Sequence, residues 1–204
     1  ISCHLGNGSS VTAVDGGKSV DTSMGFTPMA GLVMGTRSGD VDPSILVFLL
    51  REGYDADTLD NLLNRESGLL ALGGASDMRT LEDAAAAGNT TAATALEVAA
   101  YRLAKYIGAY HVAVGGAQAL VFTAGIGENS PVFRELTVDR LGALGITLDR
   151  DANQRRGPGV RLISGTDSAV PVLVVPTDEE EAIAEATAET VVRNSAAPEG
   201  TGSN

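Results

Sequence analysis

Apolar and polar residues alternate through the first 23 positions in three short runs, and glycine-containing turns separate these runs. Alternation with a period of two is typical of half-buried strands, and Gly-Asn-Gly and Asp-Gly-Gly sequences are typical of tight turns. Residues 24–42 contain four Gly and one Pro, and we expect them to form a loop. We expect a meander of antiparallel strands at residues 1–5, 9–14 and 18–23.

From Pro43 onward the chain has the composition and caps of a series of helices. Pro43 fits the first turn of a helix that carries the apolar run "SILVFLL" and ends near Gly53. Further helices are expected at 57–66, in a short piece before residue 73, at 80–87 and at 90–114. The last of these has the clearest apolar stripe, which consists of Leu96, Ala100, Leu103, Ile107 and Tyr110.

The last third of the chain alternates between short apolar runs and helical stretches. We expect strands at 119–124, 160–163 and 171–176, and a helix at 178–193. Another helix is expected to begin at Pro131 with Ser130 as its N-cap. The residues expected near its inner face are Val132, Leu136 and Leu144.

A meander followed by helices and then by strand–helix units predicts an α/β fold, with a mixed sheet and helices on its faces. Residues 1–193 contain no long linker and no internal repeat, so we expect them to form one lobe. Residues 194–204 are small and polar, which is typical of a disordered tail.

The 204-residue chain has an ordinary globular composition but a net charge of −12. This balance argues against nucleic acid or an anionic membrane as partner, since both attract basic surfaces. A phosphate ligand would need backbone N–H donors, one or two Arg and a divalent cation. The single cysteine, Cys3, can form no internal disulfide, which fits a reducing, cytoplasmic location, and no apolar run is long enough to span a membrane.

Two glycine-rich stretches are candidate ligand sites. In "HLGNGSS", residues 4–10, a turn with little side chain would let a phosphate approach several backbone N–H groups. In "VFTAGIGENS", residues 121–130, an apolar strand leads into a glycine-rich junction before a helix, which is a favourable place for a nucleotide. A plain hairpin turn and a plain strand-to-helix loop would explain the same residues.

Three polar stretches have simpler explanations beside the functional ones. Arg37 in "GTRSGDVDP" could stabilise a transferring phosphoryl group, or could form a local ion pair with Asp40 or Asp42. Glu179 in "PTDEEEAIA" could help to hold Mg²⁺, but an acidic first helical turn is itself stabilising. The segment "ASDMRT", residues 75–80, has the character of an ordinary helix cap.

Taken together, four blocks resemble the acetate kinase (acetokinase) family: "HLGNGSS", "DTSMGFTPMAGLVMGTRSGDVDP", "FTAGIGENS" and "VVPTDEEEAIA". They occur in the family's order and at compatible spacings, and the resemblance covers residues 1 to about 193. It implies the fold of sugar kinases, Hsc70 and actin, in which two lobes of βββαβαβα, ribonuclease H-like type enclose a nucleotide. This chain resembles the C-terminal lobe, with the N-terminal lobe absent.

The resemblance also implies roles for individual residues. Arg37 would be the catalytic residue that stabilises the transition state, and Glu179 would assist the metal, Mg²⁺ or Mn²⁺. The ATP phosphates would lie against His4, Leu5, Gly6, Asn7 and Gly8. The nucleotide would also contact Asp77, Met78 and Arg79, and its adenosine would contact Gly125, Ile126, Gly127, Glu128 and Asn129.

The implied reaction is reversible transfer of a phosphoryl group from ATP to acetate, which gives acetyl phosphate and ADP. The family's remaining active-site residues lie upstream, so we expect this half alone to be inactive. Propionate or butyrate kinase activity and a non-catalytic ATP-binding lobe remain alternatives. The resemblance further implies a homodimer formed through this lobe, to which the helices carrying "SILVFLL" and residues 90–114 could contribute.

Overall fold

The computed structural model of the chain describes residues 1–177, 183–184, 186–188 and 190–191. Most of the expected helix at 178–193 lies outside the described residues, although those described within it are helical. Glu179 and the expected tail at 194–204 also lie outside them.

The described strands form one mixed sheet, as the sequence predicts. Its spatial order is β3-β2-β1-β4-β6-β5. β1 pairs antiparallel with β2 and parallel with β4, and β6 continues the parallel part on the other side of β4. The strands are β1 (Ser2–Leu5), β2 (Ser9–Asp15), β3 (Lys18–Thr22), β4 (Leu120–Thr123), β5 (Arg161–Leu162) and β6 (Val172–Val174).

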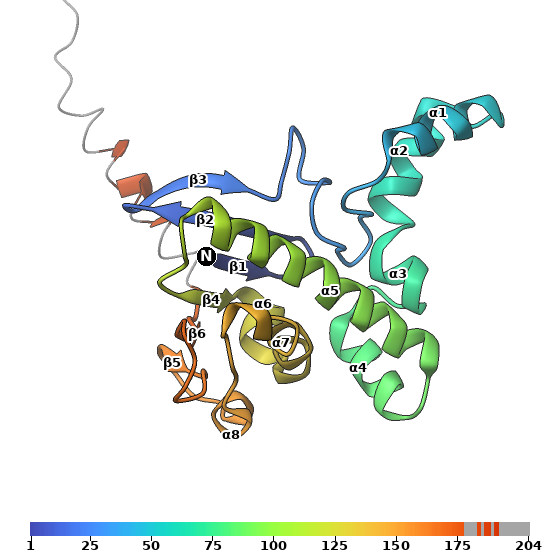
Figure 1. Ribbon diagram of the computed structural model, residues 1–204. Helices are drawn as coiled ribbons and strands as arrows, with labels where there is room; N and C mark the ends of the chain where they lie inside the picture. Colours follow the sequence, from blue (N-terminus) through green and yellow to red (C-terminus); the bar gives the residue numbers. More distant parts are fainter. Residues whose placement is uncertain (178–182, 185, 189, 192–204) are drawn as a thin grey trace, which may run out of the picture.

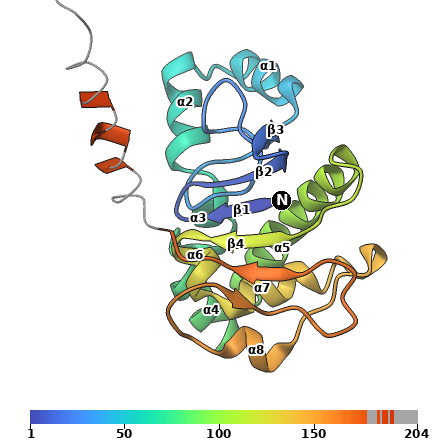
Figure 2. The same ribbon diagram turned by 90° about the vertical axis from the view of Figure 1, so that its left-hand side faces the viewer.

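Parallel pairing brings the carboxyl ends of β1, β4 and β6 to the same edge of the sheet (Figure 2). In register, His4 lies opposite Thr123, and Phe122 lies opposite Val174. The turn after β1, the segment after β4 and the segment after β6 therefore begin side by side. This is the edge at which ligands bind in most open α/β sheets.

Helices cover the sheet and extend beyond it (Figure 1). The 24-residue helix α5 contacts β2 of the sheet and also α3, α4 and α7. The helices are α1 (Pro43–Arg51), α2 (Ala56–Arg65), α3 (Gly68–Gly73), α4 (Met78–Ala86), α5 (Thr90–Ala113), α6 (Ala124–Asn129), α7 (Pro131–Val138), the 3₁₀ turn η1 (Gly142–Leu144) and α8 (Arg150–Gln154).

The core lies between the sheet and α5. All five residues of the stripe expected on the long helix are buried, and they pack with Leu5, Phe122 and Val174 from the strands. Four further alanines of α5 are buried, which lets the helix approach its neighbours closely. Burial of each large side chain contributes about 1.5–3 kcal/mol, so this seam is the main apolar support of the lobe.

Two features of the last third of the chain differ from what the sequence suggests. The "GIGENS" junction is not a plain loop, because Ala124–Asn129 forms the short helix α6. Val132 is 42% exposed, and α7 instead buries Phe133, Arg134, Thr137 and Val138. The packing of α7 on α5 buries the face that carries the ring of Phe133. The spacing of apolar residues over an eight-residue helix does not determine which face is buried. Neither η1 nor α8 has a strong enough sequence pattern to be predicted.

α1 is apolar but exposed. It has no buried residue, and the large side chains of Ile45, Val47, Phe48 and Leu50 are 47–58% exposed. α1 contacts α2 and projects with it away from the sheet (Figure 1). The run "SILVFLL" is therefore a surface feature of this chain and not part of its core. Contiguous exposed apolar surface of this kind is typical of an interaction site.

Candidate functional site

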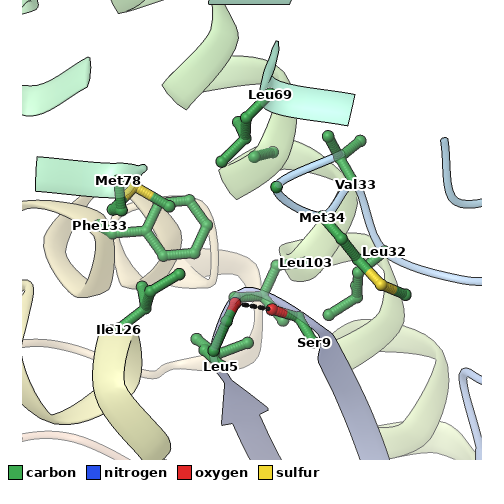
Figure 3. A pocket seen from close by; sticks show the side chains of 13 residues that line it. Leu5, Ser9, Leu32, Val33, Met34, Leu69, Met78, Leu103, Ile126 and Phe133 are labelled. Atoms are coloured by element: carbon green, nitrogen blue, oxygen red, sulfur yellow. Dashed lines mark hydrogen bonds between the residues drawn. The ribbon is translucent and has the colours of Figure 1, made fainter. Parts of the chain in front are cut away.

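The turn after β1 is compact and leaves almost no side chain at its surface. The N–H of Gly6 donates to the carbonyl oxygen of Gly8 at 3.1 Å, and the Ser9 hydroxyl donates to the Gly6 carbonyl oxygen at 3.0 Å (Figure 3). Asn7 is the one exposed side chain between the two glycines. The backbone of this turn is thus open to a ligand at the ligand-binding edge of the sheet.

Arg37 lies against this turn. A Cβ atom added to Gly8 would lie 3.2 Å from Nη1 of Arg37. The neighbouring Gly35 donates its N–H to the carbonyl oxygen of Asn7 at 3.1 Å, and a side chain at Gly35 would overlap the Asn7 amide. The structure therefore brings together two glycine-rich stretches that are separated by about 30 residues in the sequence.

The alternative explanation of Arg37, a local ion pair, is wrong. Among the described residues no carboxylate lies within ion-pair distance of its guanidinium, which instead donates to the Pro28 carbonyl oxygen at 3.1 Å and contacts the Met34 sulfur. Asp40 bonds to α5, and Asp42 is the N-cap of α1. The charge of Arg37 is therefore available to a ligand.

A second region lies between α4 and α6. A cleft of about 540 Å³, large enough for a nucleoside, separates the two helices. The two segments in which the sequence predicts nucleotide contacts, 77–79 and 125–129, face each other across it. The cleft is lined by Asp77, Met78, Arg79, Glu82, Asp83, Gly125, Asn129, Ser130, Pro131, Val132 and Arg156.

Several residues predicted to contact the nucleotide point their side chains into the protein. Leu5, Met78 and Ile126 line a closed apolar space of about 10 Å³ beneath the turn, too small for any ligand, together with Phe133 (Figure 3). Contact of these residues with a ligand would have to come from their backbone. Gly127 is buried too, because its Cα packs against the backbone of Phe122.

The polar side chains of the predicted adenosine segment also serve the fold. Glu128 accepts a hydrogen bond from the N–H of Thr177 at 3.0 Å, which joins α6 to the segment after β6. Asn129 donates to the carbonyl oxygen of Gly125 at 2.9 Å, within α6 itself. The first residue of this helix, Ala124, has a φ of 63°, a left-handed conformation that non-glycine residues rarely adopt. The residues around Ala124 thus hold its backbone in a strained conformation at the start of α6.

Asp77 is an ordinary helix cap, as its sequence context suggests. Its carboxylate accepts from the N–H of Thr80 at 2.9 Å and from the Thr80 hydroxyl at 3.0 Å, and these bonds lower the pKa of the carboxyl. Neighbouring Arg79 is exposed at the cleft and forms no ion pair within the described part of the chain. Its guanidinium is available to a ligand there.

Sequence analysis missed Glu82, which lies half-buried in the cleft. Its carboxylate accepts a hydrogen bond from the Ser130 hydroxyl, and the same hydroxyl caps α7 by accepting from the N–H of Phe133 at 3.0 Å. Burial raises the pKa of Glu82 above its ordinary value. A single Glu in a helix has no pattern that marks it, and only the position of Ser130 as N-cap could be predicted.

Sequence analysis also missed Arg134, which is 1% exposed. Its guanidinium donates to the carbonyl oxygens of Gly127 and Glu128 at 2.8 and 3.0 Å, and to the side chain and carbonyl oxygen of Asn153 at 2.7 and 2.8 Å. Burial without a bonded carboxylate lowers its pKa to about 10, so it remains charged at neutral pH. Arg134 thus holds the end of α6 in place from behind the cleft.

His4, Thr123 and Thr177 complete the edge of the sheet. His4 lies on β1 in register with Thr123, whose hydroxyl bonds to that of Thr177 after β6. Within the described residues no group of three or more His, Cys, Asp or Glu side chains is placed to hold a metal ion. The expected metal residue, Glu179, follows two positions after Thr177 and lies outside the described residues.

None of the described helices is long and apolar enough to cross a bilayer.

We predict that Arg134→Met lowers the free energy of unfolding by more than about 2 kcal/mol, because the carbonyl oxygen of Gly127 and both oxygens of Asn153 lose the hydrogen bonds that they accept from Arg134. Chemical denaturation of the two proteins measures the difference. The matched control is Arg150→Met, since Arg150 is 62% exposed and pairs only at the surface with Glu135 and Asp139. Equal effects of the two substitutions would contradict the role of Arg134.

Comparison with known proteins shows the family to which the chain belongs. The model of the acetokinase family matches residues 1–185. The chain is 68% identical over 191 residues to the acetate kinase of Arthrobacter sp. strain FB24, covering 94% of this chain and 50% of that protein. It is 62% identical over 193 residues to the acetate kinase of Micrococcus luteus, covering 92% of this chain and 50% of that protein.

Solved structures show the same likeness. The crystal structure of Porphyromonas gingivalis acetate kinase has a TM-score of 0.87 and 46% identity, covering 93% of this chain and 48% of that one. A propionate kinase from Francisella tularensis has a TM-score of 0.86 and 42% identity, with 90% and 47% coverage. The chain spans about half the length of the curated relatives it matches. On the family match, the identities and the shared fold, this chain belongs to the acetokinase family.

Proposed function

We propose that this chain is the C-terminal, nucleotide-binding lobe of an acetate kinase, formed by residues 1–193. The whole protein would transfer the γ-phosphoryl group of ATP reversibly to acetate, giving acetyl phosphate and ADP. The observation that carries the proposal is the position of Arg37, unpaired with any described carboxylate and in contact with the open turn Gly6–Gly8. The high identity to curated acetate kinases supports it.

The turn and Arg37 would act on the phosphate chain. The backbone of Gly6–Gly8 approaches the phosphates closely because no side chain keeps them away, and Asn7 and His4 add polar contacts. As an acetate oxygen attacks the γ-phosphorus, charge spreads over the acyl and phosphoryl oxygens, and the Arg37 guanidinium neutralises it. Little covalent chemistry is needed from the protein, so alignment and charge account for catalysis.

The cleft between α4 and α6 would hold the adenosine. Residues 77–79 lie on one wall, and Gly125 and Asn129 of α6 lie on the other. Glu128 and Arg134 keep the second wall in place through the contacts described above, and backbone groups of α6 face the ligand. In this proposal ATP runs from the cleft to the turn along the carboxyl edge of the sheet.

A divalent cation, Mg²⁺ or Mn²⁺, would accompany ATP. When bound, it would neutralise phosphate charge, which matters in a chain of net charge −12. Hard oxygen donors suit such an ion, and Glu179 is the residue that we propose from this chain. The described residues offer no carboxylate cluster at the edge, so its remaining ligands would be phosphate oxygens, water and groups outside this chain.

We predict that Arg37→Ala in the full-length protein lowers kcat for acetyl phosphate formation by at least ~10²-fold, as loss of one preorganised donor typically does. An acetate-dependent assay of ADP release measures the change. Arg65→Ala, at an exposed position of α2, is the matched control and should leave kcat unchanged. An unchanged kcat in Arg37→Ala would remove Arg37 from the mechanism.

Two alternatives are decided by the same assay. Propionate or butyrate would replace acetate as the best substrate if the apolar pocket for the carboxylic acid were larger, and the likeness to a propionate kinase keeps this alternative open. Rates on the three acids, measured side by side, distinguish them. A non-catalytic ATP-binding lobe would show no ATP consumption that depends on a carboxylate.

We predict that residues 1–204, prepared alone, form no acetyl phosphate, because Arg37 and the turn cannot align a carboxylate with the γ-phosphorus by themselves. The measurement is the same assay at high enzyme concentration, beside the full-length protein. Activity of the isolated chain at a rate comparable to the full-length protein would overturn the division of the site between two lobes.

We also propose a cytoplasmic homodimer whose contact includes α1, since its exposed apolar side chains suit a second copy better than water. Phe48→Asp in the full-length protein should weaken dimerisation by about 30-fold, as loss of a central aromatic residue does. Sedimentation equilibrium measures it, with Val160→Asp, at an exposed site outside the helices, as the control. A dimer unaffected by Phe48→Asp would place the contact elsewhere.

The free thiol of Cys3 is consistent with the cytoplasm and is buried, which raises its pKa to about 12.

A further inference from the structure

The loop that carries Arg37 is closed at its two ends by Asp40. One carboxylate oxygen, Oδ1, accepts from the N–H of Gly31 at 2.8 Å, and the N–H of Asp40 donates to the Gly31 carbonyl oxygen at 3.1 Å. Gly31 has a φ of 98°, and a side chain there would overlap the carbonyl group of Ser23. The ends of the loop 31–40 are therefore fixed to each other and to the end of the meander.

The second oxygen of Asp40 ties the loop to the core helix. Oδ2 accepts from the Tyr106 hydroxyl at 2.6 Å and lies 3.4 Å from Nη1 of Arg102, both on α5. Burial and the bond to Asp40 raise the pKa of Tyr106 to about 12, so the hydroxyl keeps its proton at neutral pH. The pair with Arg102 is partly exposed and contributes little, which leaves Tyr106 as the main link.

The other side of the loop is held by α2 and α3. The Thr36 hydroxyl donates to the Asn64 carbonyl oxygen at 2.9 Å, and the N–H of Ser38 donates to the carbonyl oxygen of Leu63 at 2.9 Å. The carbonyl oxygens of Met34, Gly35 and Thr36 accept from the backbone at the start of α3 at 2.8–3.0 Å. The backbone around Arg37 is thus fixed on two sides.

The side chain of Arg37 has few contacts of its own. Its guanidinium makes one hydrogen bond, to Pro28, and a weak contact with a sulfur atom, and no described carboxylate is near enough to form an ion pair. Its position beside Gly8 must therefore follow from the backbone of the loop. A change at the closure of the loop would be transmitted to the guanidinium, although the closure itself touches no ligand.

We propose that Asp40 is a positioning residue for phosphoryl transfer, which closes the loop 31–40 onto Tyr106 of α5 and thereby places Arg37 beside the phosphate turn. This inference rests on the proposed function, because it concerns the group that would stabilise the transition state. Asp40 acts through Arg37 and not on the nucleotide. Displacement of such a group by about 1 Å can reduce the rate by about 10²-fold.

The first test is Asp40→Asn in the full-length protein. The amide still accepts from Gly31 through its oxygen, but the NH2 group that then faces Tyr106 is a donor and cannot accept the hydrogen bond of the Tyr106 hydroxyl. We expect kcat to fall at least ~10-fold, and at most by the ~10²-fold that a displacement of about 1 Å can cause. KM for ATP should change by less than ~2-fold, because the lost interaction is made only in the transition state. Tyr106→Phe should lower kcat in the same way, though less.

The matched control is Asp42→Asn, which makes the same change of charge two residues away. Asp42 caps α1 through the N–H of Ser44 at 2.8 Å and has no bond to the loop 31–40. Asparagine is an equally good N-cap, so kcat should stay at its original value. A comparable fall of kcat in Asp42→Asn would show that the charge of this region matters and not the closure, and would overturn the proposal.

The decisive measurement is a double-mutant cycle with Arg37→Ala. If Asp40 acts through Arg37, Asp40→Asn causes no further loss of kcat once Arg37 is absent. If the two losses multiply, Asp40 has another role and the inference is wrong. Should Asp40→Asn lower the melting temperature enough to obscure the assay, the cycle is run with Tyr106→Phe, whose ring keeps its packing. Failure of the proposed function would differ from both outcomes, since the unmodified protein would then lack carboxylate-dependent activity.

Discussion

The parallel pairing of β1 with β4 is the interaction on which the rest of the structure depends. These strands are separated by about 115 residues, yet their pairing sets His4 beside Thr123 and begins two site segments at one edge. Parallel strands need a long crossover, and α5 completes it while burying its apolar side against the sheet. The same core that stabilises the lobe therefore also determines where the turn Gly6–Gly8 and α6 lie.

Several arginines without a carboxylate partner lie at the edge of the sheet, although the protein as a whole is acidic. The chain has a net charge of −12, but Arg37, Arg79 and Arg156 form no ion pair within the described residues and lie at the turn or in the cleft. The buried Arg134 bonds to carbonyl groups behind them. The cleft also contains the carboxylates of Asp77, Glu82 and Asp83. An anionic ligand would therefore meet favourable charge at the three arginines and not over the whole site.

The apolar arm and the Arg37 loop share their support. α2 and α3 bond to the loop on one side, and α2 carries α1 with its exposed apolar residues on the other. In the proposed dimer a contact at α1 would therefore be joined to the Arg37 loop through the packing of α1 on α2 and the backbone hydrogen bonds from α2 and α3 to the loop. α5 bounds the same loop from the core through Tyr106, which makes the position of Arg37 a property of the whole lobe.

Local patterns in the sequence determined the meander, the start of α1 at Pro43, the cap Ser130, the buried stripe of α5 and the family to which the four sequence blocks point. These features depend on backbone hydrogen bonds and side-chain periods that repeat within a few residues. Only the tertiary structure decided that Arg134 is buried, that Glu82 meets Ser130, that Asp40 meets Tyr106 and that α1 is exposed. The partners in these contacts come from distant elements, so which residues meet depends on how the helices pack on the sheet. The neighbouring residues in the sequence do not show that an arginine will be buried or that a phenylalanine will be exposed, since each is the less common outcome for its residue type.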